Sequence, residues 1–280
     1  MKIVAVVSSF YPNIDELEVN INSYLPWVDR LIIWENSSRA DSQVDSLIAR
    51  LHNDKVEVMT TGKNEYLAEP FNKCIGWAKD NGYTHLMTMD QDSCFADGHF
   101  EKYLRLIEAF PDKNVAVFGP SSNSRISVNL PATEVTHTFI SGAVFPLEIL
   151  LQQGGFNLNL AIDSIDSEYC FRCKNSGFQT IVFRDVFLQH QLGYRYKHWT
   201  GLTIVPYSAQ RTYYFIRNTL WLWEQYPQYF DKAYKCSFVK YRIIFRVFKI
   251  GFEKDSLKKL KAIFLAVSHY RQNRLGRFDF

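Results

Sequence analysis

The segment HLMTMDQDSCF, residues 85–95, decides how the first half of this 280-residue chain is interpreted. Its first five residues are mostly apolar and have the character of a buried strand. Two aspartates, Asp90 and Asp92, then follow with one residue between them. Two negative charges at the end of a buried strand indicate either a solvated turn or a ligand site. The flanking sequence, described next, favours the ligand site.

Strand-like and helix-like segments alternate before residue 85. Strands are predicted in KIVAVVSSFYP, VDRLIIWENSS, KVEVMTT and THLMTM, and helices over residues 15–24, 41–52 and 70–81. This alternation predicts an α/β fold with a parallel sheet covered by helices on both faces. Ligands of such folds lie beyond the carboxyl ends of the strands. Asn36, Asn64 and the aspartate pair fall at those ends, which favours a ligand site there.

The alternation loosens after residue 100. A helix to about residue 110 and a strand in NVAVFGP are predicted first. The segment THTFISGAVFPLEILLQQGGF predicts a strand, a turn at Ser141-Gly142 and a short helix. IDSIDSEYCFRCKNSG predicts the start of a helix, and FQTIVFRDVFLQHQLG predicts one or two strands that end near His190.

The acidic residues indicate metal and proton-transfer chemistry. Two carboxylates at positions i and i+2 can bind Mg²⁺ or Mn²⁺, which take oxygen ligands and leave positions open for phosphate. A second acidic cluster contains Asp163, Asp166 and Glu168. A carboxylate of this cluster is a candidate general base, although helix capping also explains one or two of these acids. His190 is either a structural residue or a further metal ligand.

The charge is unevenly distributed along the chain. The net charge is +3, but residues 211–280 contain 15 Lys and Arg against 5 Asp and Glu. Aromatic and aliphatic residues alternate with these cations, which predicts amphipathic helices. Such helices can lie in a membrane interface, or they can pack on the chain's own core or on a second subunit in a homodimer. No nucleic-acid-binding motif is present, and we expect no nucleic-acid partner.

Other sequence features indicate an intracellular protein. The five cysteines do not form a disulfide framework or a zinc motif, which favours a reducing compartment. MKIVAVV has no signal-peptide pattern, and no apolar run reaches the roughly 20 residues that span a bilayer. We therefore expect a cytoplasmic protein at the inner face of the cell membrane.

The order of several motifs resembles that of inverting GT-A glycosyltransferases, in particular bacterial rhamnosyltransferases of polysaccharide and O-antigen assembly. The resemblance covers about residues 2–226. It rests on VAVVSSFYP, LIIWENSS, GKNEYLAEPFNKCI, MDQDS, FISGAVF, IDSIDSEYCFR, FLQHQLG and YSAQRTYYFIRN. Two positions depart from the usual pattern: Glu35 stands where Asp is usual, and Tyr66 stands where Gly is usual.

The resemblance implies a role for each matched residue. Asp166 takes the place of the catalytic base, and Asp90, Asp92 and His190 take the places of metal ligands for Mg²⁺ or Mn²⁺. The implied donor contacts are Ser8, Phe10, Asn36, Asn64, Asn72, Asp90 and Gln91, with Arg211 and Arg217 as further cations for the diphosphate or as part of a basic helix surface. The implied acceptor contacts are Ser141, Gly142, Asp163 and Glu168.

The resemblance therefore implies a metal-dependent inverting transferase. It moves a sugar, expected to be L-rhamnose from dTDP-rhamnose, onto a saccharide or lipid-linked glycan acceptor. Another sugar from a UDP donor (galactofuranose, glucose or galactose), a nucleotidyltransferase, and a non-catalytic membrane-associated binding module remain alternatives. The expected organisation is a GT-A catalytic domain over residues 1–205 and a basic, aromatic helical region over residues 206–280.

Overall fold

The computed structural model describes residues 1–38, 42–122, 131–190, 196–197, 203–204 and 207–279. The chain forms two compact units, which are described separately below. The first unit contains Met1–Phe156 and Tyr169–Gln191, and the second contains Asn157–Glu168 and Leu192–Phe280. The domain boundary expected between residues 205 and 206 falls outside the described residues.

The first unit is built around one large sheet. Its strands are β1 (Ile3–Ser9), β2 (Arg30–Glu35), β3 (Val56–Thr60), β4 (His85–Asp90), β5 (Ser93–Phe95), β6 (Val115–Ser121), β7 (Ala132–Glu134), β8 (Ala143–Pro146) and β9 (Gln179–His190). Its helices are α1 (Ile14–Asn22), η1 (Leu25–Trp27), α2 (Val44–Leu51), α3 (Ala68–Asp80), α4 (His99–Glu108) and α5 (Leu147–Gln152). Helix α6 (Ile165–Asn175) begins in the second unit and continues into the first.

The sheet is mixed rather than wholly parallel. Its strand order is β3-β2-β1-β4-β8-β6-β9-β5, with β7 paired to β9. The strands β3, β2, β1 and β4 are parallel, as the alternation predicted. Strand β8 is antiparallel to both β4 and β6. An antiparallel neighbour needs no helical crossover, so the loss of regular alternation after residue 100 marks this change of direction.

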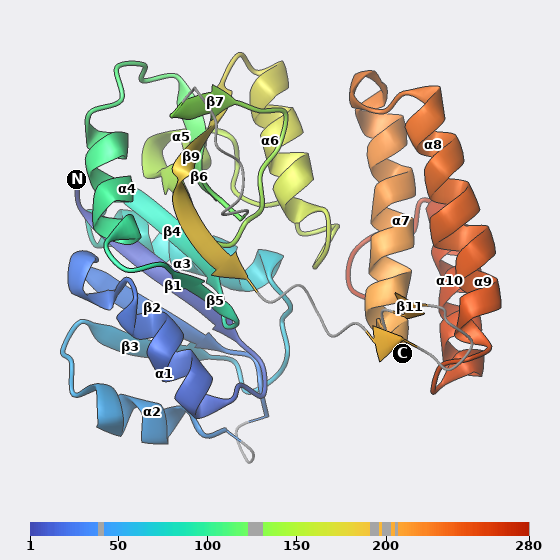
Figure 1. Cartoon of the computed structure of the whole chain (residues 1–280), viewed down its shortest axis with the longest axis horizontal. Coiled ribbons are helices and arrows are strands. Elements are labelled where there is room, and N and C mark those ends of the chain that lie inside the picture. The colour runs from blue at the N-terminus through green and yellow to red at the C-terminus, as the bar shows by residue number, and fades with distance from the viewer. Residues whose placement is uncertain (39–41, 123–130, 191–195, 198–202, 205–206, 280) are drawn as a thin grey trace. The chain divides into compact units, whose positions relative to one another are not determined.

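Helices cover both faces of the sheet, as Figure 1 shows. On one face, α1, α2 and α4 bury Leu17, Leu47 and Phe100 in a core shared with the strands. On the other face, Phe71 of α3 and Phe145 of β8 both contact Phe156, which follows α5. This α/β/α arrangement places the carboxyl ends of β1, β2 and β4 at one edge of the sheet.

The second unit is mainly helical. It contains α7 (Ala209–Gln225), η2 (Pro227–Tyr229), α8 (Lys232–Phe238), the π-helical segment η3 (Val239–Ile244), α9 (Phe245–Ile250) and α10 (Ser256–Arg271), with the short strands β10 (Tyr196–Lys197) and β11 (Thr203–Ile204). Helix α10 packs along α7, where the Tyr213 hydroxyl lies 2.8 Å from Nδ1 of His269. None of the described helices is both long enough and apolar enough to cross a membrane.

Candidate active site

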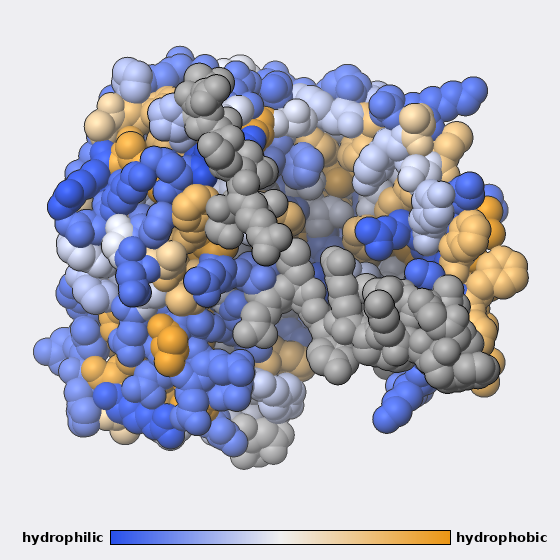
Figure 2. Space-filling model, viewed as in Figure 1, coloured by the Kyte–Doolittle hydropathy of each residue, from blue (hydrophilic) through white to orange (hydrophobic). Residues whose placement is uncertain are grey.

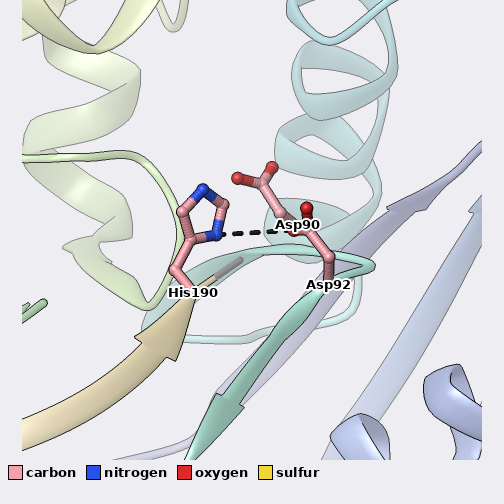
Figure 3. Close-up of side chains that lie close together, drawn as sticks. All are labelled: Asp90, Asp92 and His190. Carbon is pink, nitrogen blue, oxygen red and sulfur yellow. Dashed lines mark ion pairs between the residues drawn. The ribbon is translucent and has the colours of Figure 1, made fainter. Parts of the chain in front are cut away.

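Three strands bring Asp90, Asp92 and His190 together at the carboxyl edge of the sheet. Asp90 ends β4, Asp92 lies in the turn to β5, and His190 ends β9. One ligand atom from each of the three side chains lies within 4.8 Å of the other two. Nδ1 of His190 lies 3.4 Å from Oδ1 of Asp92, the pair joined by a dashed line in Figure 3.

The pairing of β5 with β9 positions His190. In this antiparallel pair, Ser93 is the direct partner of His190, although 97 residues separate them. The Ser93 hydroxyl oxygen lies 2.7 Å from Nδ1 of His190 and accepts a hydrogen bond from the Ser141 hydroxyl at 2.8 Å. Ser141 in turn accepts a hydrogen bond from the backbone N–H of Asp90 at 3.1 Å. One chain of hydrogen bonds therefore links Asp90 to the imidazole ring.

The turn that carries Ser141 depends on the next residue, Gly142. Its φ is +75°, a conformation that side chains rarely tolerate. A Cβ atom there would lie 2.8 Å from the Pro120 side chain and 3.1 Å from the Leu188 side chain. The Ser141-Gly142 turn predicted from the sequence therefore supports the chain of hydrogen bonds between Asp90 and His190 through close packing. The predicted contact of both residues with the acceptor stays a prediction.

The three side chains have the chemistry of a Mg²⁺ or Mn²⁺ site. Within the described residues, Oδ1 of Asp92 is a buried oxygen that accepts no hydrogen bond. An unsatisfied buried carboxylate oxygen is costly, and a bound cation would compensate it. Two carboxylates and one imidazole form a donor set that suits Mn²⁺ and is compatible with Mg²⁺. The residues present therefore fit such an ion.

The loops after β1 and β4 are tied together beside this group. The Gln91 side chain accepts a hydrogen bond from the N–H of Phe10 at 2.7 Å and donates one to the carbonyl of Phe10 at 3.3 Å. The Phe10 ring remains 46% exposed and packs edge-on against Tyr11. An exposed ring held at the end of β1 is a suitable platform for a nucleobase. Ser8, the other donor contact predicted at the end of β1, is buried.

Asn36 fixes the loop that contains Asn64 and Tyr66. Its side-chain nitrogen donates to Ser8 Oγ at 3.0 Å and to the carbonyl of Tyr66 at 2.9 Å. Its side-chain oxygen accepts a hydrogen bond from the N–H of Glu65 at 2.9 Å. Asn64 accepts a hydrogen bond from the N–H of Tyr66, whose φ is +62°. This left-handed conformation explains why Gly is usual at the position, and here Tyr66 adopts it.

Asn72 ties α3 to the segment after α5. Its side-chain nitrogen donates to the carbonyl of Phe156, and its side-chain oxygen accepts from the N–H of the same residue, both at 2.8 Å. The nitrogen and the oxygen of the Asn72 side chain are thus both hydrogen-bonded to the backbone of Phe156. The observed contacts of Asn72 are structural, and its contact with a donor stays a prediction.

The second acidic cluster lies in the second unit, at the start of α6. Asp166 and Glu168 are in the first turn of the helix, and the N–H of Ser167 donates to Oδ1 of Asp166 at 2.7 Å. Glu168 is buried and accepts a hydrogen bond from the Tyr226 hydroxyl at 2.9 Å. Asp163 lies 3.7 Å from Nε of Arg211. Within this short segment, Glu168 is buried, whereas Asp163 and Asp166 are partly exposed.

Burial dominates the electrostatics of Asp163. It raises the pKa of this carboxyl to about 6; the guanidinium of Arg211 opposes the shift and the charge of Asp166 adds to it. The side chain is only 14% exposed, and Oδ2 accepts no hydrogen bond from any described residue. Asp163 thus holds a proton more readily than a solvated aspartate does.

Arg217 and Asn218 on α7 hold the loop that leads to this cluster. The Asn218 side-chain nitrogen lies 2.8–2.9 Å from the carbonyl oxygens of Leu160, Ile162 and Asp163. Arg217 is fully buried and donates to the carbonyls of Asn159 and Gly276. Such burial leaves the Arg217 guanidinium no surface for a diphosphate, so the geometry favours a positioning role over the predicted donor contact.

Sequence reasoning missed two residues, Ser93 and Asn218. Ser93 directly follows the aspartate pair, and its hydroxyl lies between Ser141 and His190. Asn218 follows Arg217 in the matched motif, yet only the arginine was singled out. Both residues lie inside matched motifs and directly follow a charged residue. That position is the sequence signal by which they could have been found.

A cavity of about 890 Å³ lies at the opposite edge of the sheet. Its lining includes His85 at the start of β4, Val115 at the start of β6 and Pro146 at the end of the antiparallel strand β8. The cavity is therefore separated from Asp90 by the length of β4, and it is not part of the candidate active site.

Comparisons with known proteins identify relatives of the chain. The sequence pattern of glycosyl transferase family 2 matches residues 6–164. The dTDP-rhamnosyl transferase RfbF of Shigella flexneri is 24% identical to the chain over 240 residues, with 79% of each protein covered.

Solved structures share the fold at low sequence identity. GalNAc-T7, in a crystal structure with UDP, GalNAc and Mn²⁺, has a TM-score of 0.61 and 14% identity; the match covers 82% of this chain and 49% of that one. The mannosyltransferase PcManGT of Pyrobaculum calidifontis, in complex with GDP-Man and Mn²⁺, has a TM-score of 0.59 and 12% identity, with 97% and 75% covered. The chain thus spans about half the length of GalNAc-T7.

These likenesses confirm the predicted α/β GT-A fold with additional C-terminal helices. The family match runs from β1 to the residue before α6 and includes Asp90 and Asp92. Since this match covers more than half of its residues, the chain belongs to glycosyl transferase family 2 and is a glycosyltransferase.

Proposed function

We propose that the chain transfers L-rhamnose from dTDP-rhamnose to a saccharide or lipid-linked glycan acceptor and inverts the anomeric centre. The observation that carries this proposal is the grouping of Asp90, Asp92 and His190 at the carboxyl edge of the sheet. The similarity to a dTDP-rhamnosyl transferase supports the choice of sugar and nucleotide. Cell-surface polysaccharide synthesis is the corresponding process.

The donor diphosphate is bound at the metal-site residues. Asp90, Asp92 and His190 would hold Mg²⁺ or Mn²⁺; when bound, this ion neutralises charge on the departing nucleoside diphosphate. Ser93 orients the imidazole, because a proton on Nδ1 that is directed to Ser93 leaves the Nε2 lone pair free for coordination. Phe10 and Ser8 would contact the base, and Asn36 and Asn64 would shape the surrounding loop.

Asp166 acts as the general base in this proposal. Its carboxylate accepts the proton of an acceptor hydroxyl, and the oxygen attacks the anomeric carbon as the bond to the diphosphate breaks. Attack from the opposite face inverts the configuration. Arg211 contributes positive charge beside Asp163, and Ser141, Gly142, Asp163 and Glu168 remain the predicted acceptor contacts.

A donor screen tests the proposal. Purified protein is incubated with dTDP-rhamnose, UDP-galactofuranose, UDP-glucose or UDP-galactose and a panel of acceptor saccharides, and released nucleoside diphosphate and glycan product are measured. We expect turnover with dTDP-rhamnose and Mn²⁺ or Mg²⁺, and a loss of at least about 100-fold in Asp166→Asn and Asp92→Asn. Preference for a UDP donor would overturn the assigned sugar. Turnover that survives a chelator would overturn the metal role.

A further inference from the structure

Helix α10 has apolar residues on two different faces. The inward face buries Ala262, Ile263 and Ala266, so it packs within the second unit. The outward face exposes Leu257 and Phe264, at 83% and 71% of their surface. These two residues are two helical turns apart and therefore lie on the same side of the helix. The core of the second unit explains why the inward face is apolar, but it does not explain why the outward face is apolar.

The preceding helical segment repeats this pattern. Phe238 and Ile250 are buried, whereas Tyr241, Phe245 and Phe248 are exposed, Phe248 to 70%. The exposed residues recur at intervals of three and four, which places them on one side of η3 and α9. Apolar side chains gather over α8 and α9, on the right of Figure 2.

Cations dominate the surface around these apolar residues. Residues 232–264, all of which are described, contain ten Lys and Arg against two acids, Glu253 and Asp255, a net charge of +8. Glu253 is buried, where it pairs with Arg246 and Lys259. Among residues 232–264, the exposed charges are therefore cations except for Asp255. We call the exposed apolar and basic side chains of residues 232–264 the apolar-basic face.

We infer that the apolar-basic face docks on the surface of a lipid bilayer that contains anionic lipids. Exposed Phe and Leu side chains enter the boundary between headgroups and acyl chains, while Lys and Arg attract the negative surface. A cavity of about 80 Å³ beside Tyr241 is lined by three of these cations, Arg242, Arg246 and Lys249.

The charge distribution disfavours a second copy of the chain as the occupant. A two-fold symmetric dimer through this face would bring together two copies of a segment whose net charge is +8, and like charges in contact are costly. An anionic bilayer neutralises the same charge. The inference concerns where the protein binds and is independent of which sugar it transfers.

Vesicle flotation tests this inference without any donor sugar. The full chain is mixed with vesicles of phosphatidylcholine alone, or with about 30% phosphatidylglycerol, at low and high salt. We expect binding to the anionic vesicles that weakens with salt. The triple variant Phe248→Ser, Leu257→Ser and Phe264→Ser should bind at least about tenfold more weakly. Lys240→Glu combined with Lys258→Glu and Lys261→Glu should lose the preference for phosphatidylglycerol.

A matched control carries Val19→Ser and Trp27→Ser, which remove exposed apolar residues of the first unit, and it should bind as the wild type does. Circular dichroism confirms that each variant is folded. Wild-type protein that does not float with either vesicle, or a triple serine variant that floats equally well, would overturn the inference. So would a wild-type dimer, seen by sedimentation velocity, that the triple serine variant converts to monomer, because a second copy would then cover the face.

Discussion

At the scale of single residues, the ionisation of Asp163, in the loop before α6, is coupled to folding. Its φ is +59°, its side chain is largely buried and one of its oxygens has no hydrogen-bond partner among the described residues. Burial raises its pKa to about 6, above the ordinary value of 3.8. The folded chain therefore binds a proton at pH values where the unfolded chain has already released it.

This difference predicts how stability changes with pH. A raised folded-state pKa means that the contribution of Asp163 is most favourable below about pH 4 and is lost as the pH rises through about 6. Asp163→Asn removes the titration. The free energy of unfolding of this variant, minus that of the wild type, should therefore rise by up to about 3 kcal/mol between pH 4 and pH 7.

Urea denaturation at several pH values measures this difference. Asp97→Asn, at an exposed aspartate, serves as the control and should follow the wild type. Parallel stability curves for Asp163→Asn and the wild type would show that Asp163 titrates normally, and would contradict the assignment.

Sequence reasoning at the residue scale identifies groups with obvious chemistry, but it does not show which of these groups are buried. Asp90 and Asp92 were predictable because charges after an apolar strand are unusual. Arg217 was assigned to the donor because its charge was visible, whereas its burial and its contacts with two backbone carbonyls were not. Burial depends on contacts made by residues about 58 positions away, and a local pattern does not contain them.

At the scale of elements, Asn218 of α7 holds the loop before α6 together with its neighbour Arg217. This loop has left-handed backbone conformations at Ala161, Asp163 and Ser164, which non-glycine residues adopt only at a cost. Asn218 offsets that cost through its contacts with three carbonyl oxygens of the loop. The position of Asp166 therefore depends on a helix that begins more than 40 residues later.

Asn218→Ala should test this dependence. Loss of its amide leaves buried carbonyls unsatisfied, and we expect a loss of about 2–4 kcal/mol in the free energy of unfolding. Because the change acts through Asp166, kcat should fall while KM for the donor stays near the wild-type value. Denaturation and steady-state kinetics measure the two effects.

The control for this variant is Asn81→Ala, since Asn81 also donates to a backbone carbonyl but is exposed. It should change the free energy of unfolding by less than about 1 kcal/mol and leave kcat unchanged. A KM for the donor that rises as much as kcat falls would assign Asn218 to donor binding instead of base positioning.

The elements themselves were largely predictable, but their pairing was not. The first four strands and their helices follow from apolar periodicity, and the observed bounds differ by a few residues from those expected. The short strand β5 was missed, because three residues carry too little periodicity. Yet the pairing of β5 with β9 is what places His190 beside Asp92.

At the scale of the whole molecule, the segment 157–168 groups with the C-terminal helices although it interrupts the first unit in sequence. The sequence shows no change of composition at this segment, so its membership was not predictable. The predicted metal ligands belong to the first unit, and the predicted base, Asp166, belongs to the second. A metal ion bound at the predicted ligands should therefore affect the first unit and not the C-terminal helices, and an experiment can distinguish the two.

This division predicts where a bound divalent ion stabilises the chain. An ion that binds the folded state alone adds about 2.7 kcal/mol of stability at 100 times its dissociation constant. Because its predicted ligands end β4 and β9, Mn²⁺ should slow hydrogen exchange in β4, β5 and β9 and raise the melting temperature. Exchange in α8, α9 and α10 should not change, since these helices contribute no ligand.

Asp92→Asn should abolish both effects of Mn²⁺ on the protein in the absence of donor, and Asp97→Asn should retain them. Stability of the Asp92→Asn variant without metal should equal or exceed that of the wild type, because the substitution removes the negative charge of a carboxylate that has one oxygen buried without a hydrogen bond among the described residues. This combination separates a metal site from a structural ion pair between Asp92 and His190. If that pair only stabilised the fold, the variant would be less stable without metal, and Mn²⁺ would leave exchange in β9 unchanged in the wild type.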